Sequence, residues 1–321
     1  MSTKLLALWR QQRPILLSYA MMLLLFVVAV AINSGFAHPA QLTQILLLAA
    51  FIGVAGLGQT LVIIGGGIDL SVPWTLNGAA VLATVLSGGR DGPTAWVIPV
   101  LLIIGALVGV VNGFGVAWLA VPPIVMTLGT YAILQGGLLV VTHGATGLVS
   151  PALLAGFSTW RWLGIPPAAW LWLLLAAMIC FVLSRTTFGR RLYASGTSPE
   201  VTELSGVNVR ATILITYVVS GISAVLAGLL LVGYVGNAYL GMGDPYLFSA
   251  VAAVAIGGAS ILGGSGHYAG TIAGAISLTL INVVLPVLGL KPAVLQVIYG
   301  AVILIAVAAT SMRSSQTATG A

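Results

Sequence analysis

The chain has 321 residues, of which 60% are hydrophobic and only 5% are charged. Soluble domains carry about 25% charged residues, so the 11 basic and 5 acidic residues here are too few for a water-exposed surface. The mean hydropathy of +1.15 agrees and indicates an integral membrane protein. These values exclude soluble enzymes, nucleic-acid-binding modules and disordered scaffolds. The net charge of +6 fits basic loops beside a membrane, so we expect contact with membrane lipid and no nucleic-acid partner.

Apolar runs separated by glycine, proline and charged residues predict the fold. We expect an all-α integral membrane protein with about ten transmembrane helices, forming a single domain over residues 1–321. The pattern is weakest around 64–72 and 257–268, where glycine interrupts it. The predicted spans lie near 15–33, 42–64, 69–87, 95–119, 122–142, 168–184, 212–234, 245–262, 268–288 and 293–311.

The first span follows basic residues and resembles a signal peptide, with a small-residue site at Ala29-Val30-Ala31. Its apolar run is longer than that of a usual signal peptide, and further spans follow it. We therefore expect an uncleaved first helix.

The basic residues predict the orientation, because Lys and Arg collect in cytoplasmic loops. Ten spans place both termini on one side, and with the N-terminus inside, the inner segments hold most of the basic residues. Residues 1–14 are then cytoplasmic and 312–321 form a flexible cytoplasmic tail; nine or eleven spans fit the rule almost as well. The inner residues are Lys4, Arg10, Arg13, Arg185, Arg190, Arg191, Arg210 and Arg313, and the outer ones are Arg90, Arg161 and Lys291.

Several chemical signatures are missing from the sequence. The only lysines are Lys4 and Lys291, and no phosphate-binding loop of the G-x-x-x-x-G-K-[ST] type occurs. The three histidines lack metal-ligand spacing, so we expect no metal site. No serine lies in a G-x-S-x-G nucleophile motif either, and we expect no enzymatic activity. Only Asp69 and Asp244 could serve ion coupling within the membrane, which leaves an ion-coupled transporter as a weaker alternative.

A glycine-rich segment, Gly65-Gly66-Gly67, precedes Asp69 and Ser71 between two apolar runs. Glycine costs about 1 kcal/mol against alanine in a helix, and a carboxylate at the centre of a membrane costs ~2.5–3.5 kcal/mol. Such a segment is tolerated only where protein or water surrounds it. Two interpretations stay open: a turn at the inner surface in which Asp69 caps the next helix, or a broken helix beside a transport path.

A second break spans residues 257–266 and contains Gly257, Gly258, Gly263 and Gly264. Paired interruptions in two halves of a chain indicate the central site of a transporter. Residues 42–142 and 212–311 each contain about four spans and one break, which suggests an internal repeat of two four-helix halves.

Small and neutral polar residues also occur inside the spans. Glycine recurs every four residues at Gly105, Gly109 and Gly113, and again from Gly266 to Gly274, which predicts close helix packing. Neutral hydrogen-bonding side chains suit a hydroxyl-rich solute, although hydrogen bonding between helices is the favoured explanation for any single one of them. These residues are Gln59, Asn77, Asn112, Thr127, Thr130, Gln135, Asn237, Asn282 and Gln296.

The longest inner loop, residues 185–211, is rich in charge. Ser198 followed by Pro199 and Glu200 predicts the start of a short helix, and Gly206 predicts its end. Val201 and Leu204 would share one face of that helix. A capped helix here is either a docking element for a soluble partner or a solvated connector.

These motifs together resemble one family, the permeases of ribose-type sugar ATP-binding-cassette (ABC) importers. The segment Gly66-Gly67-Ile68-Asp69-Leu70-Ser71-Val72 is similar to the family signature GGIDLSVG, with Pro73 in place of the final glycine. Residues 194–198 also depart from the family pattern. The other matching segments are 123–129, 187–194, 205–207, 220–221, 255–260 and 263–271.

The resemblance implies a multi-pass permease subunit in the bacterial inner (plasma) membrane, with both termini cytoplasmic. Its implied partners are a cytoplasmic ATP-binding subunit, a periplasmic solute-binding protein and a second permease copy or sister permease. No cofactor would bind this chain, because ATP and Mg would bind the ATPase subunit. The implied docking residues are Gly189, Arg190, Arg191, Ser198, Glu200, Glu203 and Gly206.

We therefore predict the membrane pathway of an ABC importer for a monosaccharide or similar small polar solute. The alternatives are an ion-coupled secondary transporter, a membrane scaffold, or an ABC permease for a nucleoside or a signalling furanone. Glycine placement and polar residues predict the path or its gate. The predicted residues are Gly65, Gly66, Gly67, Asp69, Ser71, Gln59, Asn77, Asn112, Thr127, Gly257, Gly258, Gly263 and Gly264.

Overall fold

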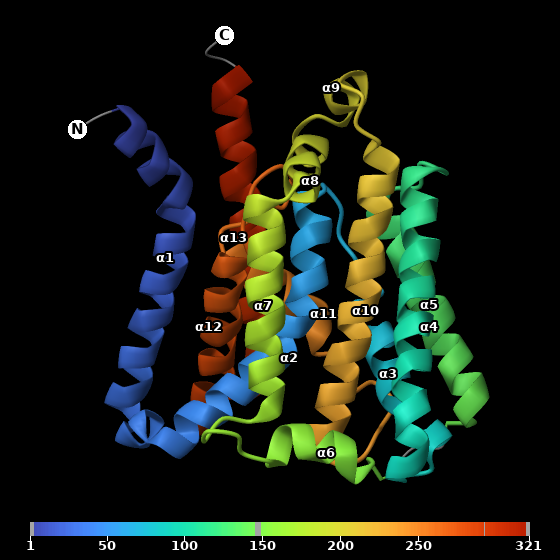
Figure 1. Ribbon diagram of the computed structural model, residues 1–321. Helices are drawn as coiled ribbons and strands as arrows, with labels where there is room; N and C mark the ends of the chain where they lie inside the picture. The colour runs from blue at the N-terminus through green and yellow to red at the C-terminus, as the bar shows by residue number, and fades with distance from the viewer. Residues whose placement is uncertain (1–2, 145–148, 292, 319–321) are drawn as a thin grey trace.

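A computed structural model describes residues 3–144, 149–291 and 293–318 (Figure 1). These residues form helices and turns, and no β-strand occurs among them. In chain order the elements are α1 (Thr3–Ile32), the 3₁₀ turn η1 (Ser34–Ala37), α2 (Pro39–Ile64), α3 (Val72–Ser87), α4 (Asp91–Ala117), α5 (Pro123–Thr142), α6 (Ala152–Thr159), α7 (Pro167–Arg185), α8 (Thr187–Thr197), α9 (Pro199–Leu204), α10 (Val209–Val235), α11 (Tyr246–Ile256), α12 (Tyr268–Val287) and α13 (Ala293–Ala318).

The predicted multi-helix membrane fold is confirmed. Within the described ranges, 7 helices are long and apolar enough to cross a membrane, and three shorter apolar helices accompany them: α3, α11 and the part of α13 up to Ala308. Each of the predicted spans coincides with one of these. The predicted tail, 312–321, begins within α13, whose described backbone reaches Ala318; residues 319–321 lie outside the described part.

Two predicted spans are wrong at one end. The span at 69–87 begins too early, because α3 starts only at Val72, and the span at 245–262 runs too far, because α11 ends at Ile256. The adjoining glycine-rich segments are not helical. With 16 and 11 residues, α3 and α11 are shorter than the ~20 residues that cross a bilayer, so each begins or ends inside the helix bundle.

Helix α2 occupies the centre of the bundle, where α7, α10, α11 and α12 pack around it (Figure 1). Within its most apolar window, 94% of the residues are buried. The helix is apolar on every side, as expected for a helix surrounded by protein. Both glycine breaks lie beside this helix, because α2 leads directly into the first and α11 and α12 flank the second.

Glycine stripes bring helix backbones into contact, as predicted. A Cβ atom added to Gly105 would lie 2.6 Å from the Gly221 carbonyl oxygen, and one added to Gly109 would meet the Tyr217 carbonyl oxygen on α10. On α12, Gly274 packs in the same way against Ala253 of α11. Both stripes therefore serve packing within the chain.

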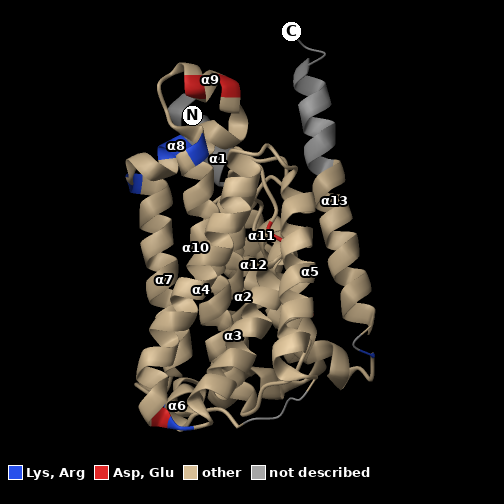
Figure 2. Cartoon of the chain, turned by 90° about the vertical axis from the view of Figure 1, so that its right-hand side faces the viewer, with Lys and Arg blue, Asp and Glu red and all other residues tan. Residues whose placement is uncertain are grey.

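The two ends of the bundle carry different elements. Helices α8 and α9 lie at one end, together with the start of α1 and the end of α13, and α6 lies at the other (Figure 1). This placement agrees with the predicted even number of crossings. Neither α6 nor α8 was predicted. Basic residues of α8, in blue, and acidic residues of α9, in red, mark the first end in Figure 2.

Candidate functional site

The first break is an irregular turn beneath the α8–α9 end, in which Asp69 is buried and Gly66 is exposed. Its backbone is held by hydrogen bonds from Gly66 N to Ile63 O and from Gly67 N to Val62 O, each 2.9 Å long. Gly66 has a φ of +87°, a conformation that only glycine adopts readily. The sequence breaks the helix here because three successive glycines remove both helix propensity and side-chain packing.

Asp69 is 3% exposed, and both of its carboxylate oxygens accept hydrogen bonds. Oδ1 accepts from the backbone N–H of Ser71 at 3.0 Å and from its hydroxyl at 2.6 Å. Oδ2 accepts from the Ser220 hydroxyl on α10 at 2.7 Å. A buried carboxylate needs such donors, because leaving it unpaired would cost several kcal/mol.

The hydrogen-bond network extends from Ser71 to two further helices. The Asn112 side chain on α4 donates to the Ser71 hydroxyl at 2.8 Å, and the Thr130 hydroxyl on α5 donates to Asn112 Oδ1 at 2.6 Å. Thr127, one turn before Thr130, donates to the Ile68 carbonyl oxygen at 3.3 Å. We refer to Asp69, Ser71, Asn112, Thr130 and Ser220 as the polar network.

The polar network unites four residues that the sequence singled out and one that it did not. Asp69, Ser71, Asn112 and Thr130 were noted as polar groups in or near spans. Ser220 was noted only as part of a family motif, because a serine in an apolar helix is an ordinary occurrence. All members are buried and pair with one another, so the network fixes the first break against α4, α5 and α10.

The second break contacts the first directly. Gly264 N donates to the carbonyl oxygen of Ile64, the last residue of α2, at 2.9 Å. Gly263 has a φ of +90°, and a Cβ atom added to it would lie 2.9 Å from Gly66 Cα. Gly257 packs on the backbone of Gly270. The two breaks therefore form one irregular layer beneath the α8–α9 end.

Helix α8 rests on both breaks. A Cβ atom added to Gly196 would collide with the Ile64 carbonyl oxygen and lie 2.7 Å from Gly264 N. The Tyr193 hydroxyl donates to the Gly266 carbonyl oxygen at 2.7 Å. Burial raises the pKa of Tyr193 to about 12, so this hydroxyl keeps its proton at neutral pH. A displacement of α8 would thus move both breaks.

The predicted docking segment forms two helices instead of one. Helix α8 is capped by the Thr186 side chain, which accepts from Gly189 N, and α9 has only 6 residues. Ser198 stands at the N-cap of α9, but its side chain makes no capping hydrogen bond, which differs from the sequence prediction. Gly206 has a φ of +80° just after α9. The side chains of Arg190, Arg191, Glu200, Glu203, Val201 and Leu204 are exposed at this surface.

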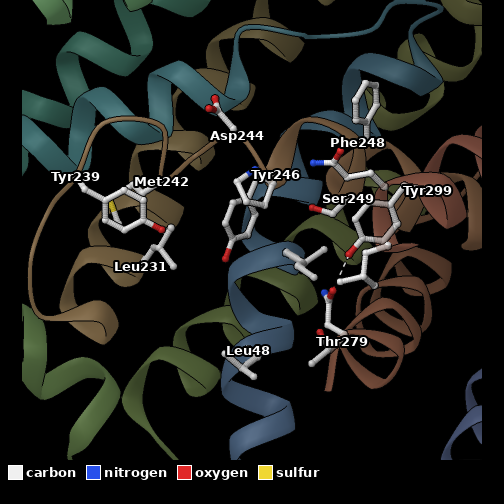
Figure 3. A pocket seen from close by; sticks show the side chains of 15 residues that line it. Leu48, Leu231, Tyr239, Met242, Asp244, Tyr246, Phe248, Ser249, Thr279 and Tyr299 are labelled. Atoms are coloured by element: carbon white, nitrogen blue, oxygen red, sulfur yellow. Dashed lines mark hydrogen bonds between the residues drawn. The ribbon is translucent and has the colours of Figure 1, made fainter. Parts of the chain in front are cut away.

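Two cavities lie at opposite ends of the bundle. The inner cavity, of about 370 Å³, is lined by Gly65–Gly67, Ser195, Gly196, Tyr217 and Leu262, and lies next to α8. The outer cavity, of about 380 Å³, lies among α2, α11, α12 and α13 in the part of the bundle nearer α6, and Figure 3 shows its lining side chains. Its lining includes Tyr239, Asp244, Tyr246, Phe248, Asn282 and Tyr299.

The remaining predicted path residues lie apart from the polar network. The Asn77 amide donates to the Tyr239 carbonyl oxygen at 3.0 Å and accepts from Gly241 N at 3.2 Å. It therefore holds the loop before α11. Gln59 is fully buried in α2, and neither of its amide atoms has a hydrogen-bond partner in the described part of the chain. In the described residues no group of His, Cys, Asp or Glu is arranged to hold a metal ion.

Comparison with known proteins decides the family. The profile of the family described as branched-chain amino acid transport system/permease component matches residues 41–307. The chain belongs to this permease family. It is also similar to individual permeases over nearly its full length, and no solved structure matches it.

The similar proteins are import permeases. The permease is 34% identical to the ribose import permease RbsC of Haemophilus influenzae, over 91% of each chain. It is 32% identical to the galactose/methyl galactoside import permease MglC of Escherichia coli, over 92% of this chain and 93% of that one. It is 32% identical to the autoinducer 2 import permease LsrD of Photorhabdus laumondii, over 87% of this chain and 86% of that one. The predicted resemblance to sugar ABC permeases is confirmed, and the chain is a multi-pass permease subunit of an ABC importer.

Proposed function

We propose that this permease forms the membrane pathway for a monosaccharide, driven by a separate cytoplasmic ATPase subunit and loaded by a periplasmic solute-binding protein. The observation that carries the proposal is the contact of α8 with both glycine breaks through Gly196 and Tyr193. A subunit that binds α8 and α9 from outside the membrane would act directly on the irregular layer within the bundle.

The charge distribution supports a cytoplasmic location for the α8–α9 end. Arg185 ends α7 and Arg190 and Arg191 lie on α8 at this end. At the α6 end, where Figure 2 shows basic and acidic residues together, Arg90 and Asp91 begin α4 and Arg161 follows α6. Under the positive-inside rule this end faces the cytoplasm of a bacterial inner membrane, and both termini face the same side. The outer cavity then opens toward the periplasm.

The docking surface combines charge with apolar contact area. Leu204 is 89% exposed and Val201 is 61% exposed on α9, next to the acidic Glu200 and Glu203. Exposed apolar side chains rimmed by charge are typical of a protein interface. We assign ATP and Mg to the ATPase subunit, because this chain has no phosphate-binding loop, and we assign no enzymatic step to the permease.

The mechanism follows from the contacts of α8. Closure of the ATPase subunits around ATP would shift α8 and, through Gly196, the end of α2 and the second break. The polar network would hold the α3 side of the first break to α4, α5 and α10 during this motion. The inner cavity, which lies between α8 and the first break, would change its access to the cytoplasm.

Reconstituted transport tests this proposal. Proteoliposomes would contain the permease and its ATPase subunit, with solute-binding protein outside, ATP inside, and labelled ribose, galactose and autoinducer 2 as solutes. We expect uptake of one sugar that stops when any one component is omitted. Uptake of autoinducer 2 and of neither sugar would change the proposed solute from a monosaccharide to a furanone, because autoinducer 2 permeases are also among the relatives. Uptake by the permease alone would overturn the proposal.

The same preparation determines the permease dimer. The importer is expected to contain two permease subunits, either two copies of this chain or this chain with a sister permease. Activity with this chain as the sole permease would establish a homodimer. Activity that requires a second permease gene product would establish a heterodimer.

A further inference from the structure

The outer cavity has the size and the walls of a small-molecule site. Its volume of about 380 Å³ lies within the range of roughly 300–1,000 Å³ that such sites occupy. It is lined by residues of α2, α10, α11, α12, α13 and the segment 237–245 before α11 (Figure 3). Helix α11 is only 11 residues long and does not extend to the α6 end of the bundle, so no part of α11 closes the cavity on that side.

Aromatic rings form much of this wall. Figure 3 shows Tyr239, Tyr246, Phe248 and Tyr299 around the cavity, on three different elements. Aromatic residues at the membrane interface usually face lipid headgroups, but Tyr299 is only 5% exposed and therefore faces inward. The negative face of an aromatic ring attracts the C–H bonds on the flat side of a sugar ring.

Polar groups line the same cavity. The Tyr299 hydroxyl donates to Asn282 Oδ1 at 3.0 Å, which orients the amide and leaves its N–H₂ group free to donate. Gln296 adds a second amide, and Asp244 adds an acceptor for solute hydroxyl groups. None of the described residues that line the cavity is Lys or Arg, so the wall favours a neutral solute over an anion.

The wall is held in place by contacts outside the cavity. Asn77 of α3 pairs with the backbone of Tyr239 and Gly241, and Gly243 packs against the Pro73 carbonyl oxygen. Met242, between these contacts, is 2% exposed and lines the cavity. The segment before α11 is therefore ordered by side-chain and backbone contacts, as expected of a preformed site.

Gln59 provides an independent observation. It lies on α2 seven residues after Ile52, a residue that lines the outer cavity. Seven residues are about two helical turns, so Ile52 and Gln59 face the same side of α2. Val62, three residues further, lines the inner cavity. The Gln59 amide is fully buried and unpaired within the described ranges, an arrangement that costs about 1–3 kcal/mol unless a partner arrives.

We propose that the outer cavity binds a neutral, ring-shaped, hydroxylated solute, and that the Gln59 amide is the next hydrogen-bonding position on the way to the inner cavity. Sugar C–H groups pack on the aromatic wall, and sugar hydroxyls pair with Asn282, Gln296 and Asp244. The inference rests on the proposed import function and adds to it a binding position within the permease.

The first test uses two variants that keep the fold. Phe248→Ala removes a ring that is 46% exposed, and Gln59→Leu replaces an unpaired amide by an apolar side chain of similar size. We expect each to lower uptake of the transported sugar about tenfold, with Tm unchanged or raised in Gln59→Leu. Phe114→Ala is the matched control, because Phe114 is 48% exposed on α4 and lies away from the cavity.

The second test measures occupancy directly. Cys180 is the only cysteine, so Cys180→Ser gives a background in which Phe248→Cys is the single thiol. In outward-facing proteoliposomes, the sugar that the wild type transports is expected to slow labelling of this thiol by an impermeant thiosulfonate several-fold. Labelling of a Val149→Cys control, at a residue that is 66% exposed outside the cavity, is expected not to change.

The outcomes separate the inference from the proposed function. Wild-type uptake together with unprotected Phe248→Cys and full transport by both variants would overturn the inference and leave the import function standing. Absence of ATP-driven uptake by the wild type for every sugar would overturn the proposed function itself.

Discussion

The Ser220 hydroxyl donates a 2.7 Å hydrogen bond to Asp69 across 151 positions of the sequence. It joins the first glycine break to the middle of α10, a helix that also packs along α4 through the glycine stripe. Because Ser71 occupies the other carboxylate oxygen, Asp69 connects the irregular backbone to the rigid part of the bundle.

Replacement of Asp69 is expected to test this connection. Asp69→Leu leaves the Ser71 N–H and the hydroxyls of Ser71 and Ser220 without their acceptor, at about 1–3 kcal/mol for each buried group. Asp69→Asn keeps one acceptor oxygen, and its N–H₂ group can donate to Ser220. We expect Tm and ATP-driven uptake to decrease from wild type to Asp69→Asn to Asp69→Leu. Equal Tm values for the leucine variant and the wild type would contradict the assignment.

The contact of Gly196 with both breaks predicts a steric effect. In Gly196→Ala the new methyl group collides with the Ile64 carbonyl oxygen and the Gly264 N–H, both backbone groups that cannot rotate away. Overpacking of this kind costs about 1–3 kcal/mol, so we expect a lower Tm and a loss of uptake. Gly136→Ala is the control, because a Cβ atom added there meets nothing within 4 Å. If both variants behave alike, α8 does not act on the breaks through Gly196.

The exposed apolar surface of α9 predicts a binding defect without a stability defect. Leu204 is 89% exposed, so Leu204→Ser removes no packing within the chain. We expect co-purification of the ATPase subunit to fall several-fold, with Tm unchanged. Leu163→Asn, at an 81% exposed residue of the α6 end, serves as the matched control. Undiminished ATPase binding by Leu204→Ser would place the interface elsewhere.

His267 predicts a pH dependence of stability. It caps α12, and its Nδ1 accepts a hydrogen bond from Ala269 N at 3.1 Å, which requires an unprotonated ring. Burial lowers the pKa of His267 below its usual value of 6.5. The unfolded chain therefore takes up a proton first, and the contribution of His267 to stability is lost as pH falls below 6.5.

A capping residue that does not titrate isolates this effect. His267→Asn keeps a side-chain acceptor at the N-cap and is expected to lose less Tm between pH 7.5 and 5.5 than the wild type. His38→Asn is the control, because His38 precedes α2 without a side-chain capping hydrogen bond. An identical loss of Tm in His267→Asn and the wild type would show that His267 does not titrate in this range.

The sequence predicts those parts of the fold that depend on composition. Apolar runs locate the membrane helices, and glycine clusters locate both breaks, because each signal is contiguous along the chain. The start of α3 and the end of α11 were placed incorrectly, because the apolar residues Ile68, Leu70, Ile261 and Leu262 belong to irregular segments. Helix α8 was missed because its two glycines and polar residues lower its intrinsic helix propensity.

Long-range contacts in the site are less accessible to sequence reasoning. Asp69 and Asn112 are unusual in apolar surroundings and were found, whereas Ser220 gave no comparable signal. The outer cavity was missed as a unit, because Tyr246, Asn282 and Tyr299 come from three helices whose packing no local pattern predicts. Asn282 and Gln296 were noted only as polar residues within spans. Gly196 was also missed, because only the folded chain places it against Ile64.

The energy source of uptake tests the central claim most directly. Solute accumulation would be measured in proteoliposomes with permease, ATPase subunit and solute-binding protein, with and without internal ATP, and with and without ionophores for protons and sodium. We predict accumulation that requires internal ATP and is unaffected by either ionophore. Accumulation by the permease alone that collapses with an ionophore would contradict the ABC importer assignment and make Asp69 a site of ion coupling.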